Sequence, residues 1–301
     1  MDLKRIEHLV HVAEYGSFSK AASVLGIAQP ALGRQIRKLE EECGVQLLHR
    51  NGRGVMLTPD GERLLERVRP LVRQLQAVVS QMNEERDRPS GLVTVGLTPT
   101  VARLIGLELI TTMQQRYPAI RVNCVVGYSG YVHEWLTDAR LDVAILHDAR
   151  RSQHLAVDEI AVLDLCLISG AKSLAPRARE MTSVRLEDIE GLPLVLPTAN
   201  HGLRRSMAVA ASERGISLRI EYEIDALELM IELVLAGAAH TVLSAGVVKE
   251  FVARGELVAR KITEPGVKTR LMLAKASNRP MTRAVRVTES CLKQLLHGVS
   301  D

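Results

Sequence analysis

The chain has 301 residues, of which 47% are hydrophobic and 25% are charged, and its formal net charge is +4. This length predicts two or three globular domains, and the balanced charge excludes a polycation that binds nucleic acid by composition alone. The four cysteines lie far apart and form no CxxC pair, which argues against a metal knuckle and for small core residues in a reducing cytoplasm. We expect neither a signal peptide nor a membrane span, because the most apolar stretch, 229–248, contains Glu232 and His240.

Residues 17–39 predict two short helices joined by a tight turn, the arrangement that places one helix in the DNA major groove. A first helix precedes them, with Asp2 as its N-cap. The second helix is expected to begin at the N-cap Ser19 and to end at Gly26, and the third to run from about 29 to 42. The apolar positions expected inside these helices are Leu3, Ile6, Val10, Ala13, Ala22, Leu25, Leu32, Ile36 and Leu39.

A small β-wing is predicted next, with strands at 46–48 and 55–57 around a turn at 51–54. Thr58 and Pro59 then begin a long helix as N-cap and first helical residue. Its apolar residues alternate at spacings of four and three: Leu64, Val68, Leu71, Leu75, Val78 and Met82. This heptad pattern predicts the seam of a two-helix dimer, and the alternative is a helix packed against its own domain.

After a hinge-like linker at 86–91, strands and helices alternate. The expected strands are 92–97, 120–126, 141–146, 163–169, 193–196, 218–224 and 241–243, and the expected helices are 101–117, 130–139, 203–214 and 226–236. This alternation predicts an α/β fold with helices covering parallel sheets. The length of the region and its extended links indicate two lobes around a cleft.

Several motifs, in their order and spacing, resemble the LysR-type transcriptional regulators over essentially the whole chain. They are Gly16-Ser17-Phe18, Ala21-Ala22, Gln29-Pro30-Ala31-Leu32, Arg34-Gln35-Ile36, Leu39-Glu40, Gly44-Val45, the wing 50–58, and weaker signatures at 141–145 and 196–197. The resemblance implies an all-α N-terminal part with a winged helix-turn-helix at 1–58, a linker helix for dimerisation with a hinge at 59–90, and an α/β effector-binding domain at 91–301. That domain would consist of two Rossmann-like lobes resembling a type 2 periplasmic binding protein. Lobe I would take about 91–160 and 267–301, and lobe II about 161–266.

Two positions depart from the family pattern. Ala28 stands where a hydroxyl residue usually caps the third helix, and the missing cap costs about 1 kcal/mol. Gly33 stands where Ser is usual, inside that helix and near the DNA, at a further cost of roughly 1 kcal/mol. We expect these changes to alter DNA affinity and sequence preference more than the DNA-binding role.

The exposed face of the third helix predicts the DNA contacts. Gln pairs with adenine and Arg with guanine in the major groove, so Gln29 and Arg34 are expected near base edges, with Pro30 fixing the helix start. Basic residues beside them are better suited to phosphates, which position the protein but specify little sequence. The expected DNA-binding residues are Ser17, Ser19, Gln29, Pro30, Arg34, Gln35, Arg37, Lys38, Arg50 and Arg53.

The ends of three strands and one loop of the second lobe predict the effector site, because ligands of doubly wound sheets bind beyond the carboxyl ends of the strands. The expected effector-binding residues are Thr98, Thr100, Tyr128, Ser129, His147, Thr198, Asn200 and His201. Positions matching Thr100, Tyr128 and His147 contact effectors in the family that the chain resembles. Helix N-termini, with Arg204 and Arg205 nearby, favour a small organic anion such as a carboxylate.

The sequence contains no GxSxG, P-loop or GxGxxG motif, and His147, Asp148 and His154 have no nucleophile or metal beside them. We therefore expect no enzyme, no cofactor and no metal site. The expected function is a cytoplasmic regulator that binds double-stranded promoter DNA as a homodimer or homotetramer, responds to a small-molecule effector and can contact RNA polymerase. The alternatives are a constitutive or redox-gated regulator of the same architecture, a solute-binding α/β protein, or a nucleoid-type DNA protein.

Overall fold

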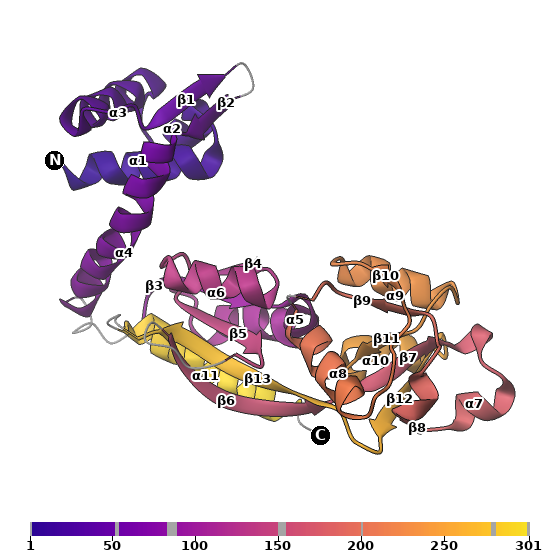
Figure 1. Ribbon diagram of the computed structural model, residues 1–301. Helices are drawn as coiled ribbons and strands as arrows, with labels where there is room; N and C mark the ends of the chain where they lie inside the picture. Colours follow the sequence, from indigo (N-terminus) through magenta and orange to yellow (C-terminus); the bar gives the residue numbers. More distant parts are fainter. Residues whose placement is uncertain are drawn as a thin grey trace. The chain divides into compact units, whose positions relative to one another are not determined.

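The computed structural model describes residues 2–51, 54–82, 89–149, 155–199, 201–277 and 281–299 (Figure 1). The chain divides into two compact units, one within residues 1–85 and the other made of almost all of residues 86–301. None of the helices in the described parts of the chain combines the length and apolar character needed to cross a bilayer.

Three helices and a two-stranded wing form the N-terminal unit. They are α1 (Leu3–Tyr15), α2 (Phe18–Leu25), α3 (Gln29–Cys43), β1 (Leu48–Asn51) and β2 (Gly54–Leu57). The apolar residues expected inside α3 are buried. In α1, Ile6 is buried and Val10 and Ala13 pack partly buried against the core as expected, but Leu9 and Val12 are buried as well and Leu3 is exposed. Positions 6, 9 and 12 also follow helical spacing, and they place larger side chains in the core than Val10 and Ala13 would.

The start of α2 differs from the prediction. Ser17 has an extended backbone and its Oγ accepts a hydrogen bond from the Lys20 backbone N at 3.4 Å, so Ser17 rather than Ser19 is the N-cap, and Phe18 lies buried inside the helix. The start of α3 is as expected, because Ala28 provides no side-chain cap. Gly33 is buried rather than on the exposed face of α3.

The wing leads into α4 (Pro59–Met82) through Thr58. The Thr58 hydroxyl accepts from the Gly61 backbone N at 3.0 Å and donates to the Gln46 carbonyl at 2.7 Å, which makes it the expected N-cap. The apolar residues of α4 separate into two sets. Leu65, Val68 and Val72 pack into the core of the N-terminal unit, whereas Leu71 is 56% exposed and Leu75 50% exposed. Leu65, Val68 and Val72 therefore follow the alternative, a helix packed on its own domain. The side chains of Val78 and Met82 lie outside the described residues.

The first lobe of the C-terminal unit is a five-stranded sheet with the order β4-β3-β5-β13-β6. Its strands are β3 (Gly91–Leu97), β4 (Ile120–Val126), β5 (Val143–His147), β6 (Leu155–Asp164) and β13 (Lys268–Ala276), and its helices are α5 (Pro99–Arg116), α6 (Ser129–Thr137) and α11 (Arg283–His297). Strands β3, β4 and β5 are parallel, but β13 is antiparallel to both of its neighbours, so the expectation of purely parallel sheets is wrong. The reason is that the chain returns from the second lobe through β13, which runs back between β5 and β6.

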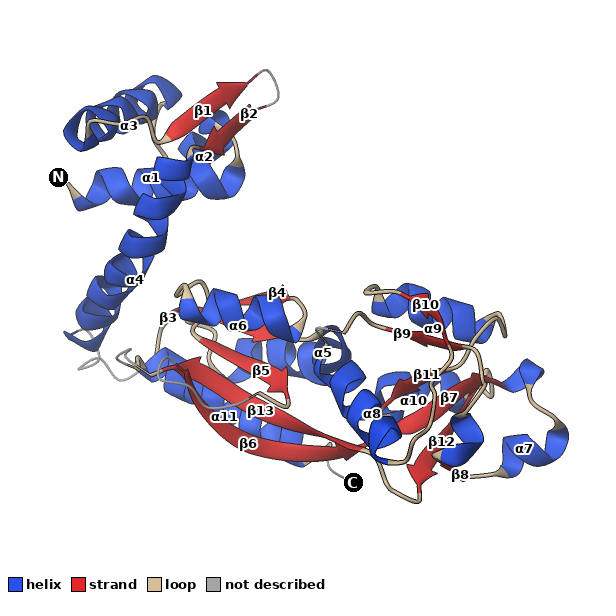
Figure 2. Ribbon diagram, viewed as in Figure 1, coloured by secondary structure: helices blue, strands red, loops and turns tan. Residues whose placement is uncertain are grey.

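Helices cover both faces of this sheet (Figure 2). Val143 and Ile145 of β5 pack with the apolar residues of α5 and α11 on one face, and Ala144 and Leu146 pack with those of α6 on the other. This alternation explains why β5 is a continuous apolar run: every position of a doubly covered strand is buried. The carboxyl ends of β3, β4 and β5 consequently meet at one edge of the sheet.

The second lobe has a four-stranded sheet of order β11-β7-β12-β8 and the parallel pair β9–β10. Its elements are β7 (Cys166–Gly170), α7 (Pro176–Glu180), β8 (Ser183–Arg185), β9 (Leu194–Leu196), α8 (Gly202–Glu213), β10 (Ile220–Glu223), α9 (Leu227–Leu235), β11 (Thr241–Leu243), α10 (Lys249–Ala253) and β12 (Leu257–Thr263), with 3-10 turns at Ala171–Ser173, Glu187–Ile189 and Ala245–Val248. The single strand expected at 163–169 is in fact the end of β6 and the start of β7, which belong to different sheets. Both strands are apolar here, so the sequence pattern hides the passage between the lobes.

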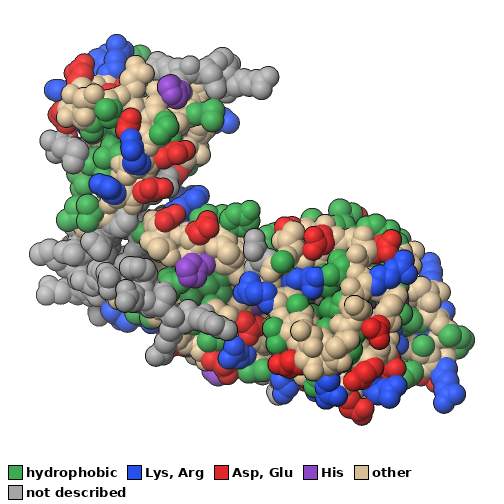
Figure 3. Space-filling model, in the orientation of Figure 1, with side chains coloured by type: hydrophobic (Ala, Val, Ile, Leu, Met, Phe, Trp, Pro, Cys, Tyr) green, Lys and Arg blue, Asp and Glu red, His purple; other side chains and the backbone are tan. Residues whose placement is uncertain are grey.

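The surface of the C-terminal unit carries both signs of charge. On the face drawn in Figure 3, Lys and Arg side chains are interspersed with Asp and Glu side chains over this unit. A mixed surface of this kind gives no extended basic area for a phosphate backbone.

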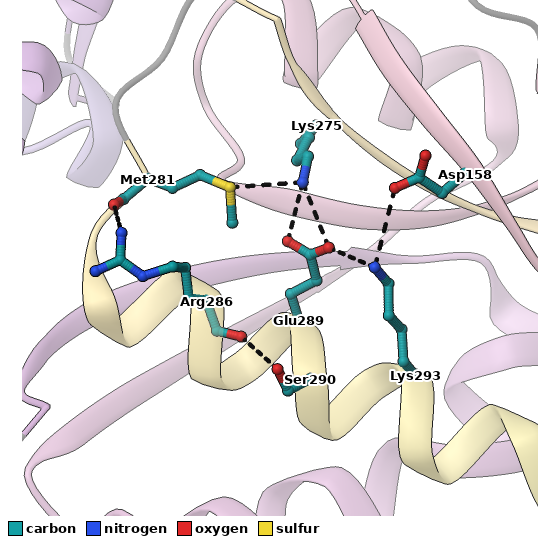
Figure 4. Close-up of polar contacts among 7 residues, drawn as sticks. All are labelled: Asp158, Lys275, Met281, Arg286, Glu289, Ser290 and Lys293. Carbon is teal, nitrogen blue, oxygen red and sulfur yellow. Dashed lines mark hydrogen bonds and ion pairs between the residues drawn. The ribbon is translucent and has the colours of Figure 1, made fainter.

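A buried ionic cluster fixes the C-terminal helix α11 on the sheet (Figure 4). Glu289 of α11 is 7% exposed, and its carboxylate lies 3.1 Å from Lys275 Nζ of β13 and 2.7 Å from Lys293 Nζ. Burial would raise the pKa of Glu289, but the hydrogen bonds from Lys293 and Lys275 outweigh it and keep the pKa below its ordinary value. Lys293 Nζ also lies 3.9 Å from Asp158 of β6, so the cluster connects α11 to both strands that link the lobes.

Candidate functional site

The exposed face of α3 carries most of the residues expected to contact DNA. Gln29, Pro30, Arg34, Arg37 and Lys38 are exposed, and α3 turns its apolar residues the opposite way, into the core. Pro30, in the first turn, needs no backbone N–H there, which suits the helix start. Four exposed side chains with hydrogen-bond donors therefore extend from this helix: Arg34, Arg37 and Lys38 from the side away from the core, and Gln29 from its first residue.

The other expected DNA contacts have structural partners or are not described. Gln35 is half-buried, and its Oε1 accepts from Arg5 Nε at 3.1 Å, so it holds α1 against α3 rather than lying free on the exposed face. Ser19 donates to Gln29 Oε1 at 2.9 Å. The backbone of Arg50 belongs to β1, but its side chain and the whole of Arg53 lie outside the described residues.

A cavity that is partly open to solvent lies between the two lobes of the C-terminal unit. It is lined by Pro99, Thr100, Tyr128, Pro197, His201, Leu203, Asp225, Leu227, Met230 and Leu243. The first lobe supplies Thr100 and Tyr128 from the ends of β3 and β4, and the second lobe supplies most of the rest. The cavity has apolar walls and a few polar groups, the composition typical of a small-molecule site.

Helix starts surround this cavity. Helix α5 begins at Pro99, α8 at Gly202 and α9 at Leu227, each within or beside the lining, and α6 begins directly after Tyr128. The first backbone N–H groups of a helix have no partner within the helix and favour a negative charge. Among the described lining residues, Asp225 is the one with a charged side chain, and Thr198 donates to it through its backbone N at 3.0 Å and its hydroxyl at 3.1 Å.

His147, at the end of β5, lies directly behind Thr100. Its side chain is buried, with Nε2 2.8 Å from Thr100 Oγ1 and Nδ1 3.0 Å from Thr269 Oγ1 of β13. Burial, assisted by neighbouring His201, lowers the pKa of His147 to about 3. Burial, assisted by the charge of Arg205, also lowers the pKa of His201, to about 4. Both imidazoles are therefore neutral near pH 7.

Asp148 connects the two lobes behind the cavity. Its carboxylate accepts from Thr269 at 3.0 Å, from Arg270 at 3.0 Å and from Ser206 of α8 at 2.9 Å. Burial would raise the pKa of Asp148, but hydrogen bonds from Arg270, Ser206 and Thr269 outweigh it and hold the pKa below its ordinary value. Its backbone is left-handed, with φ at 48°, a conformation that Asp tolerates and that is common where the fold fixes a functional side chain.

The remaining expected effector residues have different surroundings. Thr98 is buried, and its hydroxyl lies 3.3 Å from that of Thr100. The Ser129 hydroxyl is buried without a hydrogen-bond partner among the described residues and lines a separate groove with Asp148 and Ser206. Thr198 holds Asp225, and Asn200 lies outside the described residues.

The expected effector residues did not include Asp225 in the cavity wall, or Asp148, Ser206 and Thr269 behind it. Asp225 follows β10 and precedes α9, so the same reasoning about strand ends that selected Thr100 and His147 would have found it. Thr269 lies in β13, a strand that the alternation of elements did not predict.

The depressed pKa values of His147 and His201 make stability depend on pH. Between about pH 6.5 and about pH 4, the unfolded chain protonates both imidazoles and the folded chain does not. The free energy of unfolding therefore falls as the pH drops through this range, by about 1.4 kcal/mol per pH unit for each histidine at most. Urea denaturation followed by the fluorescence of Trp135, the single tryptophan, measures this dependence in the C-terminal unit. His201→Gln should make the dependence shallower, and an unchanged slope would contradict this account.

Comparison with known proteins agrees with this arrangement. The family described as "Bacterial regulatory helix-turn-helix protein, lysR family" matches residues 3–62, and the family "LysR substrate binding domain" matches residues 86–296. The HTH-type transcriptional regulator BbuR of Bordetella bronchiseptica is 28% identical over 289 residues, covering 96% of this chain and 88% of BbuR.

Solved structures show the same fold. A full-length variant of OxyR from Pseudomonas aeruginosa superposes with a TM-score of 0.79 at 20% identity, covering 99% of this chain and 97% of that one. Full-length CbnR complexed with its target DNA gives a TM-score of 0.70 at 19% identity, covering 98% of this chain and 100% of that one. With a helix-turn-helix unit, a two-lobed unit around a cavity, and matches over most of its length, the chain belongs to the LysR family of DNA-binding transcriptional regulators with an effector-binding domain.

Proposed function

We propose that this regulator binds promoter DNA through α3 as a homodimer or a dimer of dimers, and that a small organic anion in the cavity between its lobes controls it. The observation that carries the proposal is the cavity itself, which both lobes line and helix starts surround, so that a ligand there contacts both lobes. A ligand that binds two lobe arrangements with different affinity shifts the population between them. We propose that this shift changes the spacing of the two DNA-binding units of a dimer.

For DNA recognition, we propose that Gln29 and Arg34 contact base edges and that Arg37, Lys38, Arg50 and Arg53 contact phosphates. Support comes from the exposed stripe on α3, where Arg34 lies opposite the buried residues.

Substitution of Arg34 tests the assignment, with Lys38 as the matched control. Arg34→Ala should reduce the discrimination between the duplex upstream of the gene and a scrambled duplex by about 1–3 kcal/mol, because a base contact is lost. Lys38→Ala should weaken binding to both duplexes equally and lower the slope of log affinity against log salt by about 1. Fluorescence anisotropy over a range of salt measures both effects. Equal weakening on both duplexes by Arg34→Ala would contradict the base assignment.

For assembly, we propose a homodimer whose linker helices pair along α4, with two dimers forming a tetramer. Leu71 and Leu75 support it, since they are one helical turn apart and about half exposed on a helix whose other described leucines and valines pack inward. Exposed leucines at this spacing fit the seam of a two-helix pair.

The double substitution Leu71→Lys/Leu75→Lys should dissociate the dimer, because it places charges in the seam without removing core residues. Analytical ultracentrifugation of the full chain over a concentration series measures the shift to monomer. Leu229→Lys, at a leucine of α9 that is 45% exposed, is the control and should leave the assembly intact. A double variant that assembles like the wild type would exclude this seam.

For the effector, the helix starts support an anionic group and the apolar wall of Leu203, Met230 and Leu243 supports a compact carbon skeleton.

The redox-gated alternative has less support. Burial raises the pKa of all four cysteine thiols, Cys43, Cys124, Cys166 and Cys291, which lowers their thiolate fraction and their reactivity. A solute-binding protein would leave the N-terminal unit unexplained. RNA polymerase is the further partner that we propose, with the cytoplasm as the place of action.

A further inference from the structure

A continuous line of hydrogen bonds runs from the cavity to the second lobe. It begins at Thr100 in the cavity wall, passes through His147 and Thr269, and reaches the Asp148 carboxylate, with steps of 2.8, 3.0 and 3.0 Å. Ser206 of α8 joins at Asp148 from the second lobe, at 2.9 Å. Every group in this line has a limited number of protons, so the direction of each hydrogen bond can be worked out.

The order starts at Asp148. Its carboxylate is ionised and can only accept, so the Thr269 hydroxyl must give its single proton to Asp148. The Thr269 oxygen is then left as an acceptor for His147, which must carry its proton on Nδ1. A neutral imidazole with a proton on Nδ1 has a lone pair on Nε2, and Thr100 must therefore donate its own proton to Nε2.

This order decides what Thr100 offers to the cavity. Because its proton is used toward His147, the hydroxyl pair at 3.3 Å must have Thr98 as the donor and Thr100 as the acceptor. A hydroxyl oxygen has two lone pairs, so one remains. That lone pair is the polar contact that the Thr100 side chain can make in the cavity.

We infer that Thr100 presents a hydrogen-bond acceptor to the cavity, and that the effector therefore places a hydrogen-bond donor against it. The inference rests on the proposed effector site and specifies its ligand class, a hydroxy or amino carboxylate. The carboxylate of such a ligand accepts hydrogen bonds from the helix N–H groups, and its hydroxyl or ammonium group donates one to Thr100. A keto acid of the same shape would place an oxygen lone pair against the Thr100 lone pair.

Asp225 acts in the same direction. Its carboxylate lines the cavity and takes two donors from Thr198, and a carboxylate has about four lone-pair sites. Thr100 and Asp225 thus favour donors on the ligand, while the backbone N–H groups of the helix starts and the Tyr128 hydroxyl can donate to its anionic group.

The same reasoning makes Asp148 a positioning residue for specificity, acting through Thr269 and His147 without lining the cavity itself. In Asp148→Asn, Arg270 Nε keeps the amide oxygen on its side, and the NH₂ group takes the place of Oδ2. Thr269 then accepts from the amide and donates to Nδ1, and His147 moves its proton to Nε2. Ser206 can accept from the amide because its own proton can go to the Gly202 carbonyl, 3.2 Å away. Thr100 then accepts from Nε2, and its proton becomes free for the ligand.

Two-bond ¹H–¹⁵N correlation spectra of the full chain, deuterated and labelled with ¹⁵N-histidine, test the proton order directly. The signals of His147 are those that His147→Gln removes, and Thr100→Val, which shifts the Nε2 signal, identifies them if that variant does not fold. We expect a protonated Nδ1 in the wild type and a protonated Nε2 in Asp148→Asn. A wild-type His147 with its proton on Nε2 would overturn the inference even if Asp148→Asn does not fold.

Calorimetric titration with (R)- and (S)-mandelate and with phenylglyoxylate tests the ligand class, because these acids share the phenyl ring and the carboxylate, and only mandelate has a hydrogen-bond donor on its α-carbon. The wild type should bind mandelate about tenfold more tightly than phenylglyoxylate, since the keto oxygen of phenylglyoxylate would face Thr100 Oγ1 and both atoms are acceptors. Thr100→Val should remove this preference, and Asp148→Asn should remove or reverse it. Equal affinities in the wild type, or an unchanged preference in Asp148→Asn, would overturn the inference.

These outcomes are separate from the proposed function. If His147 carries its proton on Nε2 while DNA binding still responds to an organic acid, only the inferred order of protons along the hydrogen bonds is overturned. A chain with the expected tautomer whose DNA binding ignores every acid that it binds overturns the effector control instead. If neither mandelate nor phenylglyoxylate binds, the tautomer measured by nuclear magnetic resonance decides the inference.

Discussion

The close approach of α8 to the end of β5 is the constraint on which the effector site depends. A Cβ on Gly202 would lie 2.7 Å from the Cβ and 2.8 Å from the carbonyl oxygen of His147, so the lobes can meet here because this residue is glycine. The approach brings Ser206 within hydrogen-bond distance of Asp148 and His201 beside His147. A second contact, from Arg103 Nε of α5 to the Val247 carbonyl at 2.7 Å, joins the lobes elsewhere. A ligand in the cavity would therefore contact two lobes that already share polar contacts.

Much of the C-terminal unit could be predicted because doubly covered strands are continuous apolar runs. Thr100 follows β3 and His147 ends β5, two strands that are buried over most of their length, and Tyr128 follows the edge strand β4, whose alternating apolar residues also indicated a strand. Thr269 was not predicted, because it lies between the charged residues Lys268 and Arg270, and the alternating pattern of β13 was not recognised as a further strand after the one expected at 241–243. The direction of the hydrogen bonds behind Thr100 depends on this strand, so the sequence pattern alone could only indicate an anion at the helix starts.

In the N-terminal unit, motif order was a better guide than local propensity. The predicted stripe of α1 included exposed Leu3 and omitted buried Leu9 and Val12. The cap of α2 was placed two residues late, because Ser17 and Ser19 are equally good caps in isolation. Packing decides between them: with Ser17 as cap, Phe18 falls inside the helix and reaches the core. The face of α3 was less ambiguous, since Leu32, Ile36 and Leu39 leave one arrangement that buries all three.

The central claim is that a ligand in the cavity changes how the N-terminal units contact DNA. The most direct measurement is a DNase I footprint on the duplex upstream of the gene, for the wild type and Thr100→Val, with hydroxy and amino carboxylates first shown by calorimetry to bind the wild-type chain. The account predicts that at least one of these acids shortens or shifts the protected region of the wild type, and that Thr100→Val requires a higher concentration for the same change. A wild-type footprint that stays the same with every acid that binds would contradict the account.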